Sequence, residues 1–67
     1  MRVIVEEDFN DIVALVIKEL PKNNSVYERV YDGVIAYHCA KKLLPLNYDD
    51  LNAIKTEAKQ RLESKRV

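Results

Sequence analysis

The chain has 67 residues, of which 48% are apolar and 33% are charged, and its 11 basic and 11 acidic side chains cancel to a net charge of zero. A chain of this length has room for one domain and hides only about 60% of its unfolded surface when it folds alone. This composition argues against disorder, and zero net charge removes the usual electrostatic argument for nucleic-acid binding. So much apolar surface on so short a chain predicts that another protein chain covers part of it.

Few devices are available to stabilise such a small core. Cys39 is the single cysteine, so no disulfide can form within the chain. His38 is the only other strong zinc ligand, where four ligands are usual. A core of this size rarely supplies more than about 3–5 kcal/mol without disulfides, metal or oligomerisation. We therefore expect no metal and no cofactor, and a homodimer.

The first residues do not resemble a signal peptide, because apolar residues 3–5 lead directly into an acidic run. The longest apolar run, residues 12–17, is too short to cross a bilayer. A lone thiol without an export signal is typical of the reducing cytoplasm. The sequence therefore predicts a cytoplasmic protein that has no membrane partner.

The first predicted helix spans residues 7–20, where apolar residues recur at spacings of three and four and form one stripe. Asp8 is the predicted N-cap, with Asp11 completing a capping box. Pro21 ends the helix, because the residue before a proline is pushed out of the α region. Leu15 lies well off the apolar stripe, which is one apolar residue too many for a helix with a single buried face.

The second predicted helix spans residues 25–44, with Ser25 and Glu28 as its capping box and Pro45 after its end. Most sides of this helix are apolar. A helix of that kind is covered by neighbours on both flanks, so we expect it to be the central helix of the fold.

A β-hairpin is the alternative for the same region. Asp32-Gly33 lies between β-branched and aromatic residues, which is a hairpin signal. Pairing of residues 26–31 with 34–39 would give residues 1–5 a sheet to join and make a β-α-β-β-α domain. The period-two alternation is poor, however, because residues 34–36 put apolar groups on both faces. The helix is favoured, although a glycine inside a helix costs about 1 kcal/mol.

The third predicted helix spans residues 48–64, with Asn47 as its N-cap and a regular apolar stripe along one side. The predicted fold is therefore all-α: a small three-helix bundle formed by a single domain, residues 1–67, with successive helices antiparallel through short turns. Residues 1–5 and 65–67 are expected to be loose. The stripe of the third helix consists of Leu51, Ile54, Ala58 and Leu62.

His38-Cys39 is the one pair that suggests catalysis. Adjacent residues on a helix point about 100° apart, so the two side chains diverge, whereas a cysteine nucleophile needs its base within hydrogen-bond reach. Cys39 shares a helix face with Ile35 and Leu43 and is expected to be a small buried hydrophobe. We expect no catalytic residues, no enzyme activity and no small-molecule substrate.

The tyrosines of the second helix are the candidate contact residues. Tyrosine combines a large apolar area with a polar tip and is enriched at protein interfaces. Core packing with each hydroxyl reaching solvent is the alternative explanation. Together with the leftover leucine of the first helix, the excess favours a homodimer surface. The candidate partner-binding residues are Leu15, Tyr27, Tyr31 and Tyr37.

Charge is unevenly spread along the chain, with five acidic against two basic residues over 1–20 and five basic against two acidic residues over 51–67. Helix-dipole matching is the favoured account of this placement, and head-to-tail pairing between chains is the alternative. A DNA-reading helix is disfavoured, because Asp49 and Asp50 would meet base edges and phosphates. A contact with a nucleic-acid backbone is the alternative role of the basic end. Its candidate residues are Lys55, Lys59, Lys65 and Arg66.

From the sequence we expect a small cytoplasmic adaptor or regulator that acts by protein–protein contact, with itself and with an unidentified protein. In size, neutrality and lack of motifs the chain is similar to accessory products of phages and mobile elements, an analogy of class alone. The alternative is a nucleic-acid-associated accessory or regulatory protein that uses the basic end of the third helix.

Overall fold

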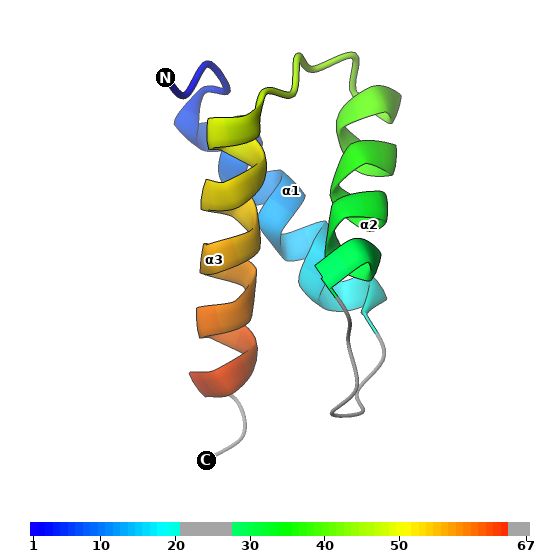
Figure 1. Cartoon of the computed structure of the whole chain (residues 1–67), viewed down its shortest axis with the longest axis vertical. Coiled ribbons are helices and arrows are strands. Elements are labelled where there is room, and N and C mark those ends of the chain that lie inside the picture. Colours follow the sequence, from blue (N-terminus) through cyan, green and yellow to red (C-terminus); the bar gives the residue numbers. More distant parts are fainter. Residues whose placement is uncertain (21–27, 65–67) are drawn as a thin grey trace.

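The computed structural model describes residues 1–20 and 28–64, which form three helices: α1 (Glu6–Glu19), α2 (Glu28–Lys41) and α3 (Tyr48–Ser64) (Figure 1). The described residues contain no strand, which confirms the all-α prediction. The hairpin alternative is wrong, because Asp32 and Gly33 lie inside α2. Gly33 has no positive φ angle, and an Asp-Gly hairpin turn would require one.

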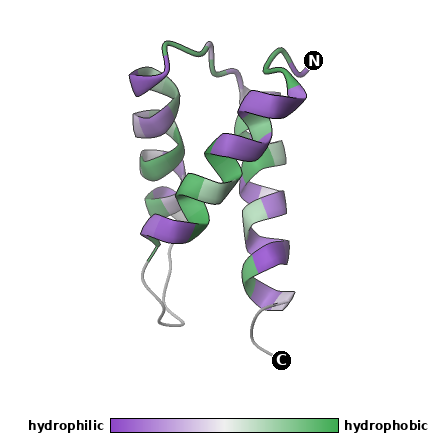
Figure 2. Ribbon diagram, turned by 180° about the vertical axis from the view of Figure 1, so that it is seen from behind, coloured by the Kyte–Doolittle hydropathy of each residue, from purple (hydrophilic) through white to green (hydrophobic). Residues whose placement is uncertain are grey.

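Successive helices run antiparallel, and α1 lies obliquely across both α2 and α3 (Figures 1 and 2). The prediction that the second helix is the central one is not borne out, because each helix packs against the other two and α1 is the helix that crosses both of its neighbours (Figure 1). One side of α2 has no neighbour, so the apolar residues around it are not all covered. The buried core consists of Ile4, Phe9, Ile12, Val13, Val16, Leu20, Tyr31, Ile35, Cys39, Ile54 and Ala58.

Helix α1 begins without a side-chain cap, since Val5 occupies the N-cap position. Asp8, the predicted N-cap, lies instead in the first turn with Glu6 and Glu7. Carboxylates in a first turn stabilise a helix through its dipole, which explains why the acidic run still marks the helix start. At the other end Leu20 adopts an extended conformation with ψ 141°, as the following proline requires.

Helix α2 ends at Lys41, three residues earlier than predicted, because Leu43 turns into the left-handed region with φ 57°. The Leu43 N–H donates to the Ala40 carbonyl at 3.1 Å, and the Leu44 N–H donates to the Cys39 carbonyl at 2.9 Å. This pair of bonds is a Schellman motif, which usually has glycine at the left-handed position. The predicted capping box at Ser25 lies outside the described residues.

Helix α3 begins as predicted, with the Asn47 Oδ1 accepting a 2.8 Å hydrogen bond from the Asp50 N–H. The same side chain anchors residues 1–5, since its Nδ2 donates to the Met1 carbonyl at 2.6 Å. The Val3 N–H donates to Asp50 Oδ2 at 2.9 Å, and the Met1 amino group pairs with Asp49. The first five residues are therefore held against the start of α3.

Candidate functional site

The large apolar side chains that the described residues leave exposed come from three segments: residues 1–5, the last part of α2 with the turn after it, and the first residue of α3. These segments all lie toward the same end of the bundle, where the N-terminus and the α2–α3 connection are found (Figure 1). We call these exposed side chains together the apolar end. It consists of Met1, Val3, Val5, Tyr37, Leu43 and Tyr48.

The N-terminal part of the apolar end lies in residues 1–5, where the chain bends at Ile4. Ile4 is buried in the core, whereas its neighbours Val3 and Val5 are exposed. Tyr48 lies beside this segment at the start of α3 and is 75% exposed.

Leu43 is the most unusual residue of the apolar end. Its side chain is 91% exposed and its backbone is left-handed. That conformation costs an L-residue about 1–2 kcal/mol and is ordinarily given to glycine or asparagine. Among the residues that the structure describes, neither packing nor backbone geometry explains a leucine at this position.

Tyr37 lies one turn before the end of α2, and its ring is 54% exposed. The Lys41 Nζ is 5.5 Å from the ring centroid, and the His38 ring meets it edge-on at 5.2 Å. Gly33, on the same outward side of the helix, has nothing within 4 Å of the place a Cβ would take. The outward side of α2 is therefore open, and Tyr37 is the one large apolar side chain that this helix exposes.

The structure separates the partner-binding residues predicted from the sequence. Tyr31 is in the core, with the Lys59 Nζ 5.4 Å from its ring centroid, so it does not share a surface with Tyr37. Leu15 is partly buried on α1. Tyr27 lies outside the described residues. Of the predicted set, Tyr37 is the one residue that belongs to the apolar end. The other members, Met1, Val3, Val5, Leu43 and Tyr48, were not among the predicted contact residues.

The predicted nucleic-acid residues that the structure describes are engaged within the chain. The Lys55 Nζ donates to Asp32 Oδ1 at 2.8 Å and is largely covered, while Lys59 covers Tyr31. Both contacts join α3 to α2, so these two cations serve the packing of the bundle. Lys65 and Arg66 lie outside the described residues.

His38 and Cys39 point into different surroundings. His38 pairs with Glu19 across the contact between α1 and α2. Burial, and to a lesser extent the charge of Asp50, raise the pKa of the Cys39 thiol. Reactive thiols have the opposite shift. Within residues 1–20 and 28–64, no three metal-ligating side chains gather into a cation site, and no helix is long and apolar enough to span a bilayer.

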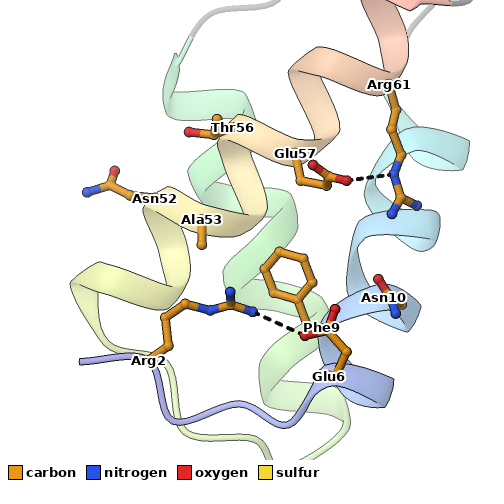
Figure 3. Close-up of a pocket in the computed structure, with 9 residues that line it drawn as sticks. All are labelled: Arg2, Glu6, Phe9, Asn10, Asn52, Ala53, Thr56, Glu57 and Arg61. Atoms are coloured by element: carbon orange, nitrogen blue, oxygen red, sulfur yellow. Dashed lines mark hydrogen bonds and ion pairs between the residues drawn. The ribbon is translucent and has the colours of Figure 1, made fainter.

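An open groove of about 590 Å³ lies between α1 and α3 (Figure 3). The Arg2 guanidinium lies over the Phe9 ring, 4.2 Å from its centroid, and Arg2 pairs with Glu6 at 3.9 Å. Both carboxylates of the groove are paired with arginines, Glu6 with Arg2 and Glu57 with Arg61. The groove can offer hydrogen bonds, among them those of the Thr56 hydroxyl. Its other lining residues are Asn10, Asn52, Ala53, Thr56, Glu57 and Arg61.

No family model, no curated protein and no solved structure matches this chain.

Proposed function

We propose that this chain is a small protein-binding module, an adaptor or regulator that acts by contact through its apolar end. Leu43 is the observation that carries the proposal, because its left-handed conformation costs stability while its side chain is 91% exposed and is not covered by the described residues. Residues that break a local structural rule without compensation are expected at functional positions. A partner that covers the Leu43 side chain would offset the cost of the left-handed conformation by burying this leucine.

The chemistry of the apolar end fits a protein partner better than a nucleic acid. Valine, leucine and tyrosine side chains are contact groups for apolar protein surfaces, and tyrosine is enriched among interface hot spots. Nucleic-acid contacts depend on cations that reach phosphates. Lys55 and Lys59 are instead turned toward α2. A cytoplasmic setting belongs to the same proposal, because the single thiol is buried and cannot pair within the chain.

The test is a comparison of three tagged chains in affinity capture from the native host, read by mass spectrometry. Leu43→Asp places a charge in the apolar end, and aspartate tolerates the left-handed conformation better than leucine does. Gln60→Asp adds the same charge at an exposed position of α3 far from that end. We expect the parent chain and Gln60→Asp to retain a set of proteins that Leu43→Asp does not retain. The untagged chain is expected to be one of them.

Capture of the same proteins by all three chains would contradict the proposal, and so would capture of none. Fluorescence anisotropy with a short duplex tests the alternative at about 50 mM salt, where phosphate contacts are strong. Tight binding there, unaffected by Leu43→Asp, would favour the nucleic-acid function.

A further inference from the structure

We propose that the apolar end binds a second copy of this chain, in a two-fold dimer that sets the end of α2 in one copy against the starts of α1 and α3 in the other. This inference rests on the proposed function and names its partner. Net charge is zero, so two copies do not repel each other overall. The distribution of charge across the apolar end then decides which partner fits.

Charges of opposite sign occupy opposite sides of the apolar end. Lys41 and Lys42 lie at the end of α2, whereas the first turns of α1 and α3 carry exposed carboxylates. Figures 1 and 2 place the end of α2 on one side of the bundle and the starts of α1 and α3 on the other. The exposed carboxylates of the acidic side are Glu6, which pairs with Arg2, Asp49, which pairs with the Met1 amino group, and Glu7.

Two of these charges are available to a partner. Glu7 and Lys41 form no ion pair with any other described residue, and the Lys41 Nζ lies over the exposed Tyr37 ring. Each side also carries its own apolar groups, Leu43 on the basic side and Val3 with Val5 on the acidic side. The apolar end therefore carries a basic side and an acidic side, each with apolar groups, that are complementary to each other.

A two-fold axis is the symmetry that uses both halves at once. In an isologous dimer the same patch serves both copies, so the basic side of each copy meets the acidic side of the other. Each contact of Lys41 with Glu7 of the other copy would then occur twice.

The size of the surface sets the strength of the dimer. The two shorter extents of the bundle are 19 and 18 Å, so this end offers less than the roughly 800 Å² per partner of a standard stable interface. A small apolar contact with charged surroundings is expected to associate with a Kd of about 10–100 µM.

Sedimentation equilibrium over about 5–500 µM spans that range. The parent chain is expected to rise from its 7.8 kDa monomer mass toward twice that value. Lys41→Glu and Glu7→Lys should each weaken the dimer about tenfold or more, because each puts like charges together at two symmetric positions. The double variant, Lys41→Glu with Glu7→Lys, should restore association, since it exchanges the two signs.

Lys18→Glu is the matched control for Lys41→Glu, because it makes the same change in the last turn of α1, at the other end of the bundle. It should leave association unchanged, and circular dichroism should show all variants folded. A monomer mass throughout the range would overturn the dimer, and so would a double variant as weak as either single variant. The proposed function survives that failure if the host capture still depends on Leu43.

Discussion

The Val3 N–H donates a 2.9 Å hydrogen bond to Oδ2 of Asp50, which lies 47 positions later in the chain and is fully buried. The other oxygen of this carboxylate, Oδ1, accepts no hydrogen bond from the described residues, and the Arg2 Nε is 3.8 Å away from it. Asp50 also lies in the first turn of α3, where the helix dipole favours its charge. One side chain thus joins residues 1–5 to the bundle and supports half of the apolar end.

Replacement of Asp50 by alanine should therefore be costly. Asp50→Ala removes the acceptor of the Val3 N–H and the charge that faces Arg2, and we expect the free energy of unfolding to fall by about 2–4 kcal/mol. Urea denaturation measures this change. Asp49→Ala is the control, because its carboxylate is exposed, and it should cost less than about 1 kcal/mol. Equal losses from the two variants would show that burial of Asp50 is not what stabilises the N-terminal segment.

Local signals in the sequence were sufficient to predict the three helices. Leu20 is held extended by the proline after it, which ends α1, and Asn47 caps α3 as its amide chemistry suggests. The early end of α2 was not predictable in this way, because a leucine carries no signal for the left-handed conformation of Leu43. Only the backbone hydrogen bonds from residues 43 and 44 reveal it.

The candidate site was harder to predict than the fold, because an apolar residue in a sequence is normally taken as core. Val3, Ile4 and Val5 are all apolar, and the sequence does not tell which of them is buried where the chain bends at Ile4. Tyr31 and Tyr37 are tyrosines of the same helix, and the sequence does not show which of the two is buried. Which of them is covered depends on where α1 crosses α2, and residue types do not encode that crossing.

Leu43→Gly should stabilise the monomer while it weakens association. Glycine relieves the left-handed strain, and we expect the free energy of unfolding to rise by about 1 kcal/mol. Leu43→Ala removes the same side chain and keeps the strain, so it should leave monomer stability nearly unchanged. Urea denaturation at low micromolar concentration separates the two effects from dimerisation. A Leu43→Gly chain less stable than the parent would mean that the exposed leucine has a contact within the chain.

Gly33→Ala is expected to stabilise α2 by about 0.5–1 kcal/mol, because alanine loses less backbone freedom than glycine in a helix and its Cβ meets nothing within 4 Å. Ala36→Gly, on the same exposed side, should cost a similar amount. Thermal unfolding measured for both variants gives the two differences. A loss of stability in Gly33→Ala would reveal a neighbour that approaches this position closely.

Cys39 gives the chain a dependence on alkaline pH. Burial first, and then the charge of Asp50, raise the pKa of its thiol above the ordinary value of 9.0. The folded chain therefore keeps this proton to higher pH than the unfolded chain does, so stability is unaffected below about pH 9 and falls as the pH rises above it. Cys39→Ala should lose less stability than the parent between about pH 8 and pH 10 in urea denaturation. Parallel curves for the two chains would show that the thiol titrates alike in both states.

Tyr31 and Tyr37 should respond to truncation in opposite ways. Tyr31→Ala removes a ring from the core and leaves the Lys59 cation without its aromatic contact, so we expect a loss of about 3–5 kcal/mol in the free energy of unfolding. Tyr37→Ala removes an exposed ring and should cost less than about 1 kcal/mol. Urea denaturation of the two variants under the same conditions makes the comparison. If Tyr37→Ala were the more destabilising, the ring would be part of the monomer core and its place in the apolar end would be lost.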